Sequence, residues 1–280
     1  MMDAEKKVVD GGGEYKMDLR LLDKDSKKTK MSFLLKKTSV AYANTLRRII
    51  VNRVPVLAVE TLEIKKNNSA LYDEQVAHRI GLIPLVTDQK TYNMKRECKC
   101  GGKGCAMCEL KMTLRVKGPK TVYSSDIKST DPKVKPAYDK IPIVKLLKGQ
   151  EINLVAIAEM SEAKEHAKWS PGLVYYKYKP EIKISKKGES CEKCADVCPV
   201  DVFDFKGKLK INKDNYFKCH LCNACVDESD GEVKVDYDKE SFIFYMESWG
   251  QLDCKKMVVT GIERFNKILD TFNTQVKEIK

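Results

Sequence analysis

Residues 39–63 have the sequence SVAYANTLRRIIVNRVPVLAVETLE, which predicts a helix followed directly by a strand. Ser39 can cap the N-terminus of this helix with its hydroxyl group. Apolar side chains then recur at helical spacing on one face, at Tyr42, Ala43, Leu46, Ile49 and Ile50. Pro55 ends the helix because proline has no backbone N–H, and Val56–Ile64 has the composition of a strand. The apolar face is wide for a thin domain, so we expect a partner chain to cover part of it.

Elements on both sides of this segment extend the prediction to an α+β fold. Tyr15–Leu22 and Met31–Leu35 alternate apolar and polar residues across the charged turn Asp23–Lys30, which predicts a hairpin. Further elements are predicted as a short helix at Asp73–Arg79 and as strands at Lys111–Val116, Ile152–Met160, Val174–Ile184 and Ser241–Glu247.

The last segment predicts a long helix with an apolar seam that repeats every seven residues. The seam consists of Val258, Ile262, Phe265, Leu269, Phe272 and Val276. Such a repeat is typical of a helix that packs along its length on another surface. The spacing alone leaves open whether that surface belongs to the chain's own domain or to a partner chain.

The 280-residue chain is 42% hydrophobic and 33% charged, with a formal net charge of +12. No apolar run approaches the roughly 20 residues that span a bilayer, and Met1–Gly13 lacks the apolar stretch of a signal peptide. We therefore expect a cytoplasmic protein without membrane contact. The positive charge suits nucleic acid or an acidic subunit. Acidic residues lie between the lysine pairs, however, which favours a solvated surface over direct DNA binding.

Eleven cysteines in a reducing compartment indicate bound metal rather than a disulfide framework. Four of them form the pattern C-x-C-x4-C-x2-C, at Cys98, Cys100, Cys105 and Cys108. Four thiolates suit the tetrahedral coordination of zinc, and a closed set is typical of a structural site. Glycines between them permit the left-handed turns of such a loop, at Gly101, Gly102 and Gly104. Free or redox-active cysteines are the alternative.

A second group of cysteines has the spacing of one site of a two-cluster ferredoxin. Those proteins repeat C-x2-C-x2-C-x3-C-P, and the fourth cysteine of each run ligates the other cluster. Here Cys198 precedes Pro199, and the later run supplies Cys219, Cys222 and Cys225. These four cysteines complete one site, for which we expect a 4Fe-4S cluster, with a 3Fe-4S cluster or zinc as alternatives.

The other ferredoxin site lacks two of its ligands. Gly188 and Ser229 occupy positions where thiolates are needed, which leaves only Cys191 and Cys194. We therefore predict that this second site is vestigial. Between the two cysteine runs, Val202–Phe205 and Leu209–Ile211 flank a glycine and predict a small hairpin.

Several segments together resemble the alpha-like subunits of cellular RNA polymerases, and in particular the archaeal D subunit family and its eukaryotic counterpart. The NTLRRI core at Asn44–Ile49 is the most specific part of this resemblance. The other similar segments are SALYDEQVAHRIGLIPL at Ser69–Leu85, WSPGLVYYKYKP at Trp169–Pro180 and FIFYMESWG at Phe242–Gly250. The resemblance covers nearly all of Tyr15–Lys280.

This resemblance implies a scaffold rather than an enzyme. In the family, a dimerisation domain pairs with the small L subunit, and the large catalytic subunits assemble on that heterodimer, so DNA is met only within the complex. For this chain the resemblance implies a dimerisation domain formed by residues 14–65, 172–185 and 232–280. A β-rich domain with the zinc loop is inserted at 66–171, and a ferredoxin-like iron–sulfur domain at 186–231.

The resemblance also implies which residues meet other subunits. The expected dimer interface consists of Tyr42, Leu46, Ile49 and Ile50 with Val258, Ile262, Phe265, Leu269 and Phe272. We expect Arg47 and Arg48 to contact acidic groups of a large subunit, with solvated arginines as the alternative.

No acidic cluster suited to two magnesium ions occurs in the sequence, so we assign no catalytic residues. Two alternative functions are an electron-transfer or redox-sensing protein and a nucleic-acid-binding zinc protein. Stoichiometric co-purification with polymerase subunits distinguishes a scaffold from both.

Overall fold

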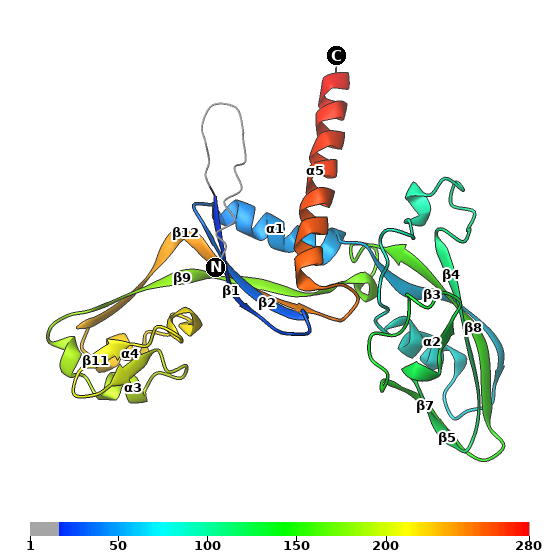
Figure 1. Ribbon diagram of the computed structural model, residues 1–280, viewed down its shortest axis with the longest axis horizontal. Coiled ribbons are helices and arrows are strands. Elements are labelled where there is room, and N and C mark those ends of the chain that lie inside the picture. Colours follow the sequence, from blue (N-terminus) through cyan, green and yellow to red (C-terminus); the bar gives the residue numbers. More distant parts are fainter. Residues whose placement is uncertain (1–16, 280) are drawn as a thin grey trace. The chain divides into compact units, whose positions relative to one another are not determined.

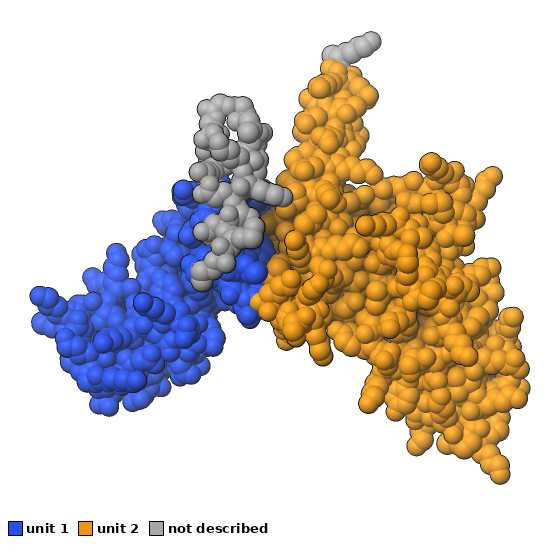
Figure 2. All heavy atoms as spheres, viewed as in Figure 1, with its two compact units in different colours: residues 1–23, 32–45, 175–245 blue, residues 24–31, 46–174, 246–280 orange. Residues whose placement is uncertain are grey.

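The computed structural model describes residues 17–279, so Met1–Gly13 and the first residues of the predicted dimerisation domain lie outside the described part. The chain divides into two compact units (Figure 2). The first unit holds the residues up to Asp23 together with 32–45 and 175–245. The second unit holds 24–31, 46–174 and the residues from Met246 onward.

Four strands form a sheet in the order β1-β2-β12-β9 (Figure 1). Their bounds are Asp18–Lys24 for β1, Lys30–Lys36 for β2, Gly172–Ile184 for β9 and Val233–Ser248 for β12. The neighbouring β1 and β2 confirm the predicted hairpin. Aromatic side chains pack across this sheet: the rings of Phe33 and Phe244 stack with centroids 4.9 Å apart.

Strand β12 begins earlier than its predicted start at Ser241. It begins at Val233, which is fully buried in the core of the cysteine-rich segment between β9 and β12. The acidic and lysine residues that follow Val233 interrupt the apolar alternation, which hides this part of the strand from sequence analysis.

The cysteine-rich segment contains short elements around a small core. Its helices are α3 (Lys193–Asp196) and α4 (Ala224–Glu228), and its strands are β10 (Phe203–Phe205) and β11 (Leu209–Ile211). Strands β10 and β11 pair antiparallel, which confirms the predicted hairpin. The buried residues of this core are Cys194, Val202, Phe203, Leu209, Cys219, Cys225 and Val233.

Helix α1 spans Val40–Arg53 and begins at the predicted cap, where the Tyr42 N–H donates to Ser39 Oγ at 3.2 Å. The side chains of Leu46 and Ile50 are buried within the chain itself, whereas Tyr42 and Ile49 are half-buried. Two of the four α1 residues expected at the dimer interface therefore face the chain's own core.

A second four-stranded sheet has the order β3-β8-β4-β6, and its neighbouring strands pair antiparallel. Its strands are β3 (Val56–Asn67), β4 (Glu109–Lys117), β6 (Lys128–Ser129) and β8 (Glu151–Ser161). Burial alternates strictly along β8, so one face packs on the core that also receives Val76 and Ile80 of α2 (Asp73–Gly81). Strands β5 (Lys120–Tyr123) and β7 (Pro142–Leu146) form a separate antiparallel pair.

Short 3-10 helices connect several of these elements. They lie at Lys95–Glu97 (η1), Ser124–Asp126 (η2), Ala167–Trp169 (η3), Gly188–Ser190 (η4) and Tyr216–Lys218 (η5).

The predicted terminal helix is confirmed as α5, Cys254–Glu278. Asp253 caps it by accepting the Lys256 N–H at 2.7 Å. Gly261 lets α5 approach α1 closely, because a Cβ atom at this position would lie only 3.0 Å from Ile50 Cγ1. The fully buried residues of α5 end at Gly261, so its later turns are uncovered in this chain.

A buried carboxylate fixes the first turns of α5. Glu162 is fully buried, and its oxygens lie 3.0 Å from Arg53 Nη1, 2.8 Å from Arg96 Nη2 and 2.5 Å from Arg264 Nη2. These arginines come from the end of α1, from η1 and from α5. One negative charge thus holds three segments that are far apart in the sequence.

Glu162→Gln is expected to lower the free energy of unfolding by about 2–4 kcal/mol, because it removes the buried negative charge that pairs with all three guanidinium groups. Chemical denaturation of the full-length chain measures this loss. Glu165→Gln is the control, since the side chain of Glu165 is 54% exposed, and it is expected to change stability by less than about 0.5 kcal/mol. Equal effects of the two substitutions would contradict the assigned role of Glu162.

Candidate metal centres

The first cysteine set lies between η1 and β4, as its sequence spacing predicts. The sulfur atoms of Cys98, Cys100, Cys105 and Cys108 all lie within 4.8 Å of one another. The closest sulfur pairs, Cys98 with Cys105 and Cys100 with Cys108, are each 3.6 Å apart. This arrangement can bind a metal ion, because four sulfur ligands surround one point.

Local backbone geometry brings these sulfur atoms together. Gly101, Gly102 and Gly104 adopt φ values of 64°, 81° and 89°, a region that favours glycine. The Cys105 N–H donates to Cys108 Sγ at 3.2 Å. Lys95 connects the loop to the sheet by two salt bridges, because its Nζ lies 2.7 Å from Glu109 Oε1 and 2.6 Å from Glu159 Oε1.

The protonation of this set favours a bound cation. A hydrogen bond with Cys98 lowers the pKa of Cys100 to about 6, whereas burial raises the pKa of Cys108 to about 12. Four thiolates this close repel one another, and a divalent cation stabilises the deprotonated form of all of them. The donor set therefore fits a closed thiolate site such as that of structural zinc.

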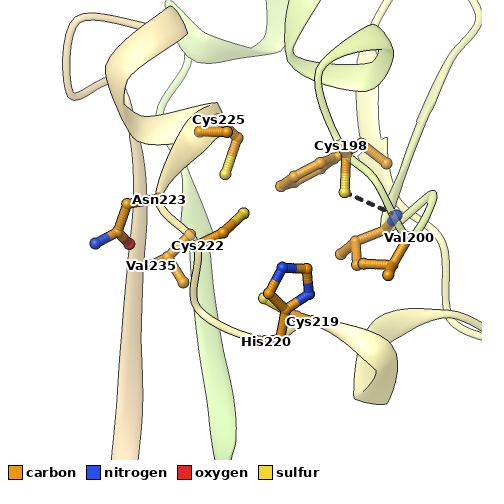
Figure 3. Close-up of a pocket in the computed structure, with 11 residues that line it drawn as sticks. Cys198, Val200, Cys219, His220, Cys222, Asn223, Cys225 and Val235 are labelled. Carbon is orange, nitrogen blue, oxygen red and sulfur yellow. Dashed lines mark hydrogen bonds between the residues drawn. The ribbon is translucent and has the colours of Figure 1, made fainter.

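The second cysteine set lines a small cavity of about 10 Å³ in the cysteine-rich segment. Figure 3 shows the sulfur atoms of Cys198, Cys219, Cys222 and Cys225 around this space. The remaining lining is mostly apolar and includes Val200, Val202, Phe203 and Val235. The structure thus brings the four cysteines that the sequence assigns to one cluster to the lining of the same cavity.

The turn through this set wraps the chain around the cavity. Leu221 and Asn223 adopt φ values of 62° and 63°, a left-handed conformation that costs a non-glycine residue about 1–2 kcal/mol. Such strained residues cluster at functional sites. The Val202 N–H donates to Cys198 Sγ at 3.3 Å, a contact also drawn in Figure 3.

Burial and mutual repulsion act on these thiols together. Burial, together with the neighbouring Cys198, Cys219 and Cys222, raises the pKa of Cys225 to about 11. Cys219 and Cys225 are buried, whereas Cys222 is exposed. The set therefore fits an iron–sulfur cluster, whose positive iron ions stabilise the thiolates. Such a cluster would be buried except near the exposed Cys222.

The two positions without thiolates in the predicted vestigial site make other contacts. Cys191 and Cys194 form a disulfide with their sulfur atoms 2.18 Å apart. A Cβ atom on Gly188 would lie 3.0 Å from the backbone oxygen of Glu232, and Ser229 Oγ accepts the Val233 N–H at 2.9 Å. A side chain at position 188 would thus make a tight contact with Glu232, which a displacement of a few tenths of an ångström would relieve.

Sequence reasoning missed some residues that shape these sites. Glu162 gave no signal because a lone acidic residue after a strand is usually solvated. Lys177, which lies beside Cys219, was one of several lysines in the alternating segment YYKYK. Cys254 is a small buried residue, as expected, and its thiol donates to the Thr29 carbonyl at 3.1 Å.

Comparison with known proteins identifies the family. Residues 62–172 match the family model described as the RNA polymerase Rpb3/RpoA insert domain. DNA-directed RNA polymerase subunit Rpo3 of Methanosarcina mazei is 41% identical over 249 residues, which cover 88% of this chain and 92% of that protein. Subunit Rpo3 of Archaeoglobus fulgidus is 35% identical over 257 residues, which cover 91% of this chain and 97% of that protein.

The chain belongs to the Rpo3 family of RNA polymerase subunits. In this Rpo3-family chain, the segment matched by the insert-domain model contains α2, the first cysteine set and most of the sheet β3-β8-β4-β6. Among the described helices, none combines the length and the apolar character needed to cross a membrane.

Cys108→Ser is expected to remove the metal ion from the first cysteine set, because one of four sulfur ligands is lost. Elemental analysis should then show about one divalent metal ion fewer per chain. Cys254→Ser is the matched control, since it removes another buried thiol that lies outside both cysteine sets. An unchanged metal content in Cys108→Ser would contradict the assignment.

Proposed function

We propose that this Rpo3-family chain is a non-catalytic assembly subunit of DNA-directed RNA polymerase that acts in transcription in the cytoplasm. It pairs with the small alpha-like L subunit, and the heterodimer is the platform for the large catalytic subunits. DNA is contacted only within that complex. Family membership supports this proposal, and its main structural support is the exposed apolar seam of α5.

Helix α5 presents an apolar face that its own chain leaves uncovered. The exposed fractions are 39% for Ile262, 42% for Leu269, 59% for Phe272 and 46% for Val276, and Val258 and Phe265 are half-buried. An isolated helix of this composition is only marginally stable in water, because most helical stability comes from packing of its apolar face. A partner helix that covers this seam supplies that packing.

The N-terminal helix contributes less to the proposed interface than its sequence indicates. Tyr42 and Ile49 are half-buried and retain part of their surface for a partner. Arg48 is exposed and suits an acidic group of a large subunit, whereas Arg47 is half-buried.

The proposal includes two metal groups. One structural zinc ion is held by the first cysteine set, which the close approach of four sulfur atoms supports. One iron–sulfur cluster, of the 4Fe-4S type or alternatively 3Fe-4S, is held by Cys198, Cys219, Cys222 and Cys225, which the shared cavity supports. When bound, the cluster supplies a covalent cross-link between two turns and a one-electron redox centre.

Replacing Leu269 and Phe272 by Asp is expected to abolish binding of the L subunit. Two charges without partners would be buried in an interface, which weakens binding by about 100-fold or more. Co-expression followed by affinity capture of the L subunit measures this loss.

The control replaces Thr271 and Thr274 by Asp. Both residues are exposed on α5 outside the seam, so the same charge is added while the apolar face stays intact. Equal recovery of the L subunit with both double variants would place the interface elsewhere.

Cys222→Ser is expected to abolish the visible iron–sulfur absorption and to loosen residues 186–231, since cluster binding also stabilises so small a domain. Cys191→Ser should leave about four iron atoms per chain, because Cys191 lies in the vestigial site. Anaerobic iron analysis and visible spectroscopy measure both results. About eight iron atoms per chain, halved by Cys191→Ser, would show that a second cluster forms.

A further inference from the structure

Cys219, one of the four proposed cluster ligands, lies at the end of a short segment that side chains of the neighbouring sheet contact. Three side chains make these contacts, and we call Lys177, Tyr216 and Tyr245 the clasp. Lys177 belongs to β9 and Tyr245 to β12, while Tyr216 begins η5. All three lie in the first compact unit, within residues 175–245.

Lys177 makes the contacts nearest to the cluster site. Its ammonium group donates to the carbonyl of Lys218 at 3.0 Å and to the carbonyl of Cys219 at 2.8 Å. The same group lies over the ring of Tyr245, 5.3 Å from its centroid. Lys177 therefore fixes the two peptide groups that orient the side chain of Cys219.

The two tyrosines extend this attachment toward the N-terminal end of the segment. The Tyr245 hydroxyl donates to the Phe217 carbonyl at 3.0 Å, and the Tyr245 ring stacks on Tyr175 with centroids 5.1 Å apart. The Tyr216 hydroxyl donates to the carbonyl of Pro180 in β9 at 2.5 Å. The carbonyls of three successive residues, Phe217–Cys219, thus all accept hydrogen bonds from the sheet.

An ordered and partly buried lysine such as Lys177 costs free energy unless other interactions offset that cost. Fixing a lysine side chain costs up to about 2 kcal/mol of conformational entropy, and burial penalises its charge further. Lys177 is half-buried, and no carboxylate forms a salt bridge with it among residues 17–279. A cluster held by four thiolates would supply the missing negative charge.

We propose that Lys177 is a positioning residue for the iron–sulfur site. With Tyr245 it holds the Phe217–Cys219 turn on the sheet, so that Cys219 Sγ faces the cavity before the cluster is inserted, and its ammonium group then stands as a positive charge beside the cluster. This inference rests on the cluster assigned above.

The test uses the full-length chain, loaded with iron and sulfide under anaerobic conditions. The half-life of the visible absorption in the presence of EDTA is compared for the unmodified chain and for Lys177→Met, Tyr245→Phe and Lys183→Met. Lys183 is exposed and lies on the same strand as Lys177. Its replacement therefore makes the same change of charge and shape away from the turn.

The half-life is expected to fall about tenfold in Lys177→Met and about fivefold in Tyr245→Phe, which lose a charge-assisted and a neutral hydrogen bond. Lys183→Met should match the unmodified chain. Tyr245→Phe keeps the aromatic ring and its stack, so this variant folds even if Lys177→Met does not.

The midpoint potential of the cluster separates this role from simple stabilisation of the fold. Lys177→Met should lower the potential, because a positive charge beside Cys219 favours the more negative, reduced cluster. Tyr245→Phe should leave it unchanged, since no charge is removed.

Half-lives of both clasp variants within about twofold of the unmodified chain would overturn the inference, as would an unchanged potential in Lys177→Met. An unmodified chain that takes up no iron would overturn the proposed cluster, and this inference with it. Unchanged half-lives or an unchanged potential would leave the cluster assignment intact. Failure of the inference about Lys177 is therefore distinguishable from failure of the proposed cluster.

Discussion

The second compact unit depends on the buried charge of Glu162. Taking a carboxylate out of water is costly, and the cost is offset only when its oxygens meet well-placed positive groups. Arg53, Arg96 and Arg264 provide them from the end of α1, from η1 and from α5. Helix α5 therefore leaves the unit at a fixed point, where Gly261 also permits contact with Ile50. Because the charge and the close packing both act on its first turns, the later turns of α5 are free to present their apolar seam.

The sequence predicts those features that depend on neighbouring residues. Helix α1 is predictable because its cap at Ser39, its apolar spacing and Pro55 all act within a few residues. The same holds for the β10–β11 hairpin and for α5, whose period is visible without knowledge of the fold. The first cysteine set is predictable because four ligands at short spacing leave the chain few ways to close around an ion.

Features that depend on distant residues escape sequence analysis. Leu46 and Ile50 have the same spacing as Tyr42 and Ile49, and only the packing of α5 at Gly261 shows that Ile50 faces inward. The early start of β12 at Val233 depends on a core built mainly from the cysteine-rich segment. The partners of Glu162 and Lys177 lie tens of residues away in the chain, so neither contact leaves a local pattern.

The cysteine-rich segment has a very small core, and two kinds of interaction can stabilise it: a bound group and the clasp contacts with the sheet. Three of its seven buried core residues are cysteines, namely Cys194, Cys219 and Cys225. Apolar burial alone therefore contributes little, and a bound group must add to it. The clasp contacts, by contrast, involve only backbone carbonyls and side chains of β9, β12 and η5. They require no metal, and they therefore keep the turn that carries Cys219 on the sheet whether or not a cluster is present. On the proposed assignment, the sheet can form before the cluster is inserted, and insertion then closes the core onto a ligand that is already in place.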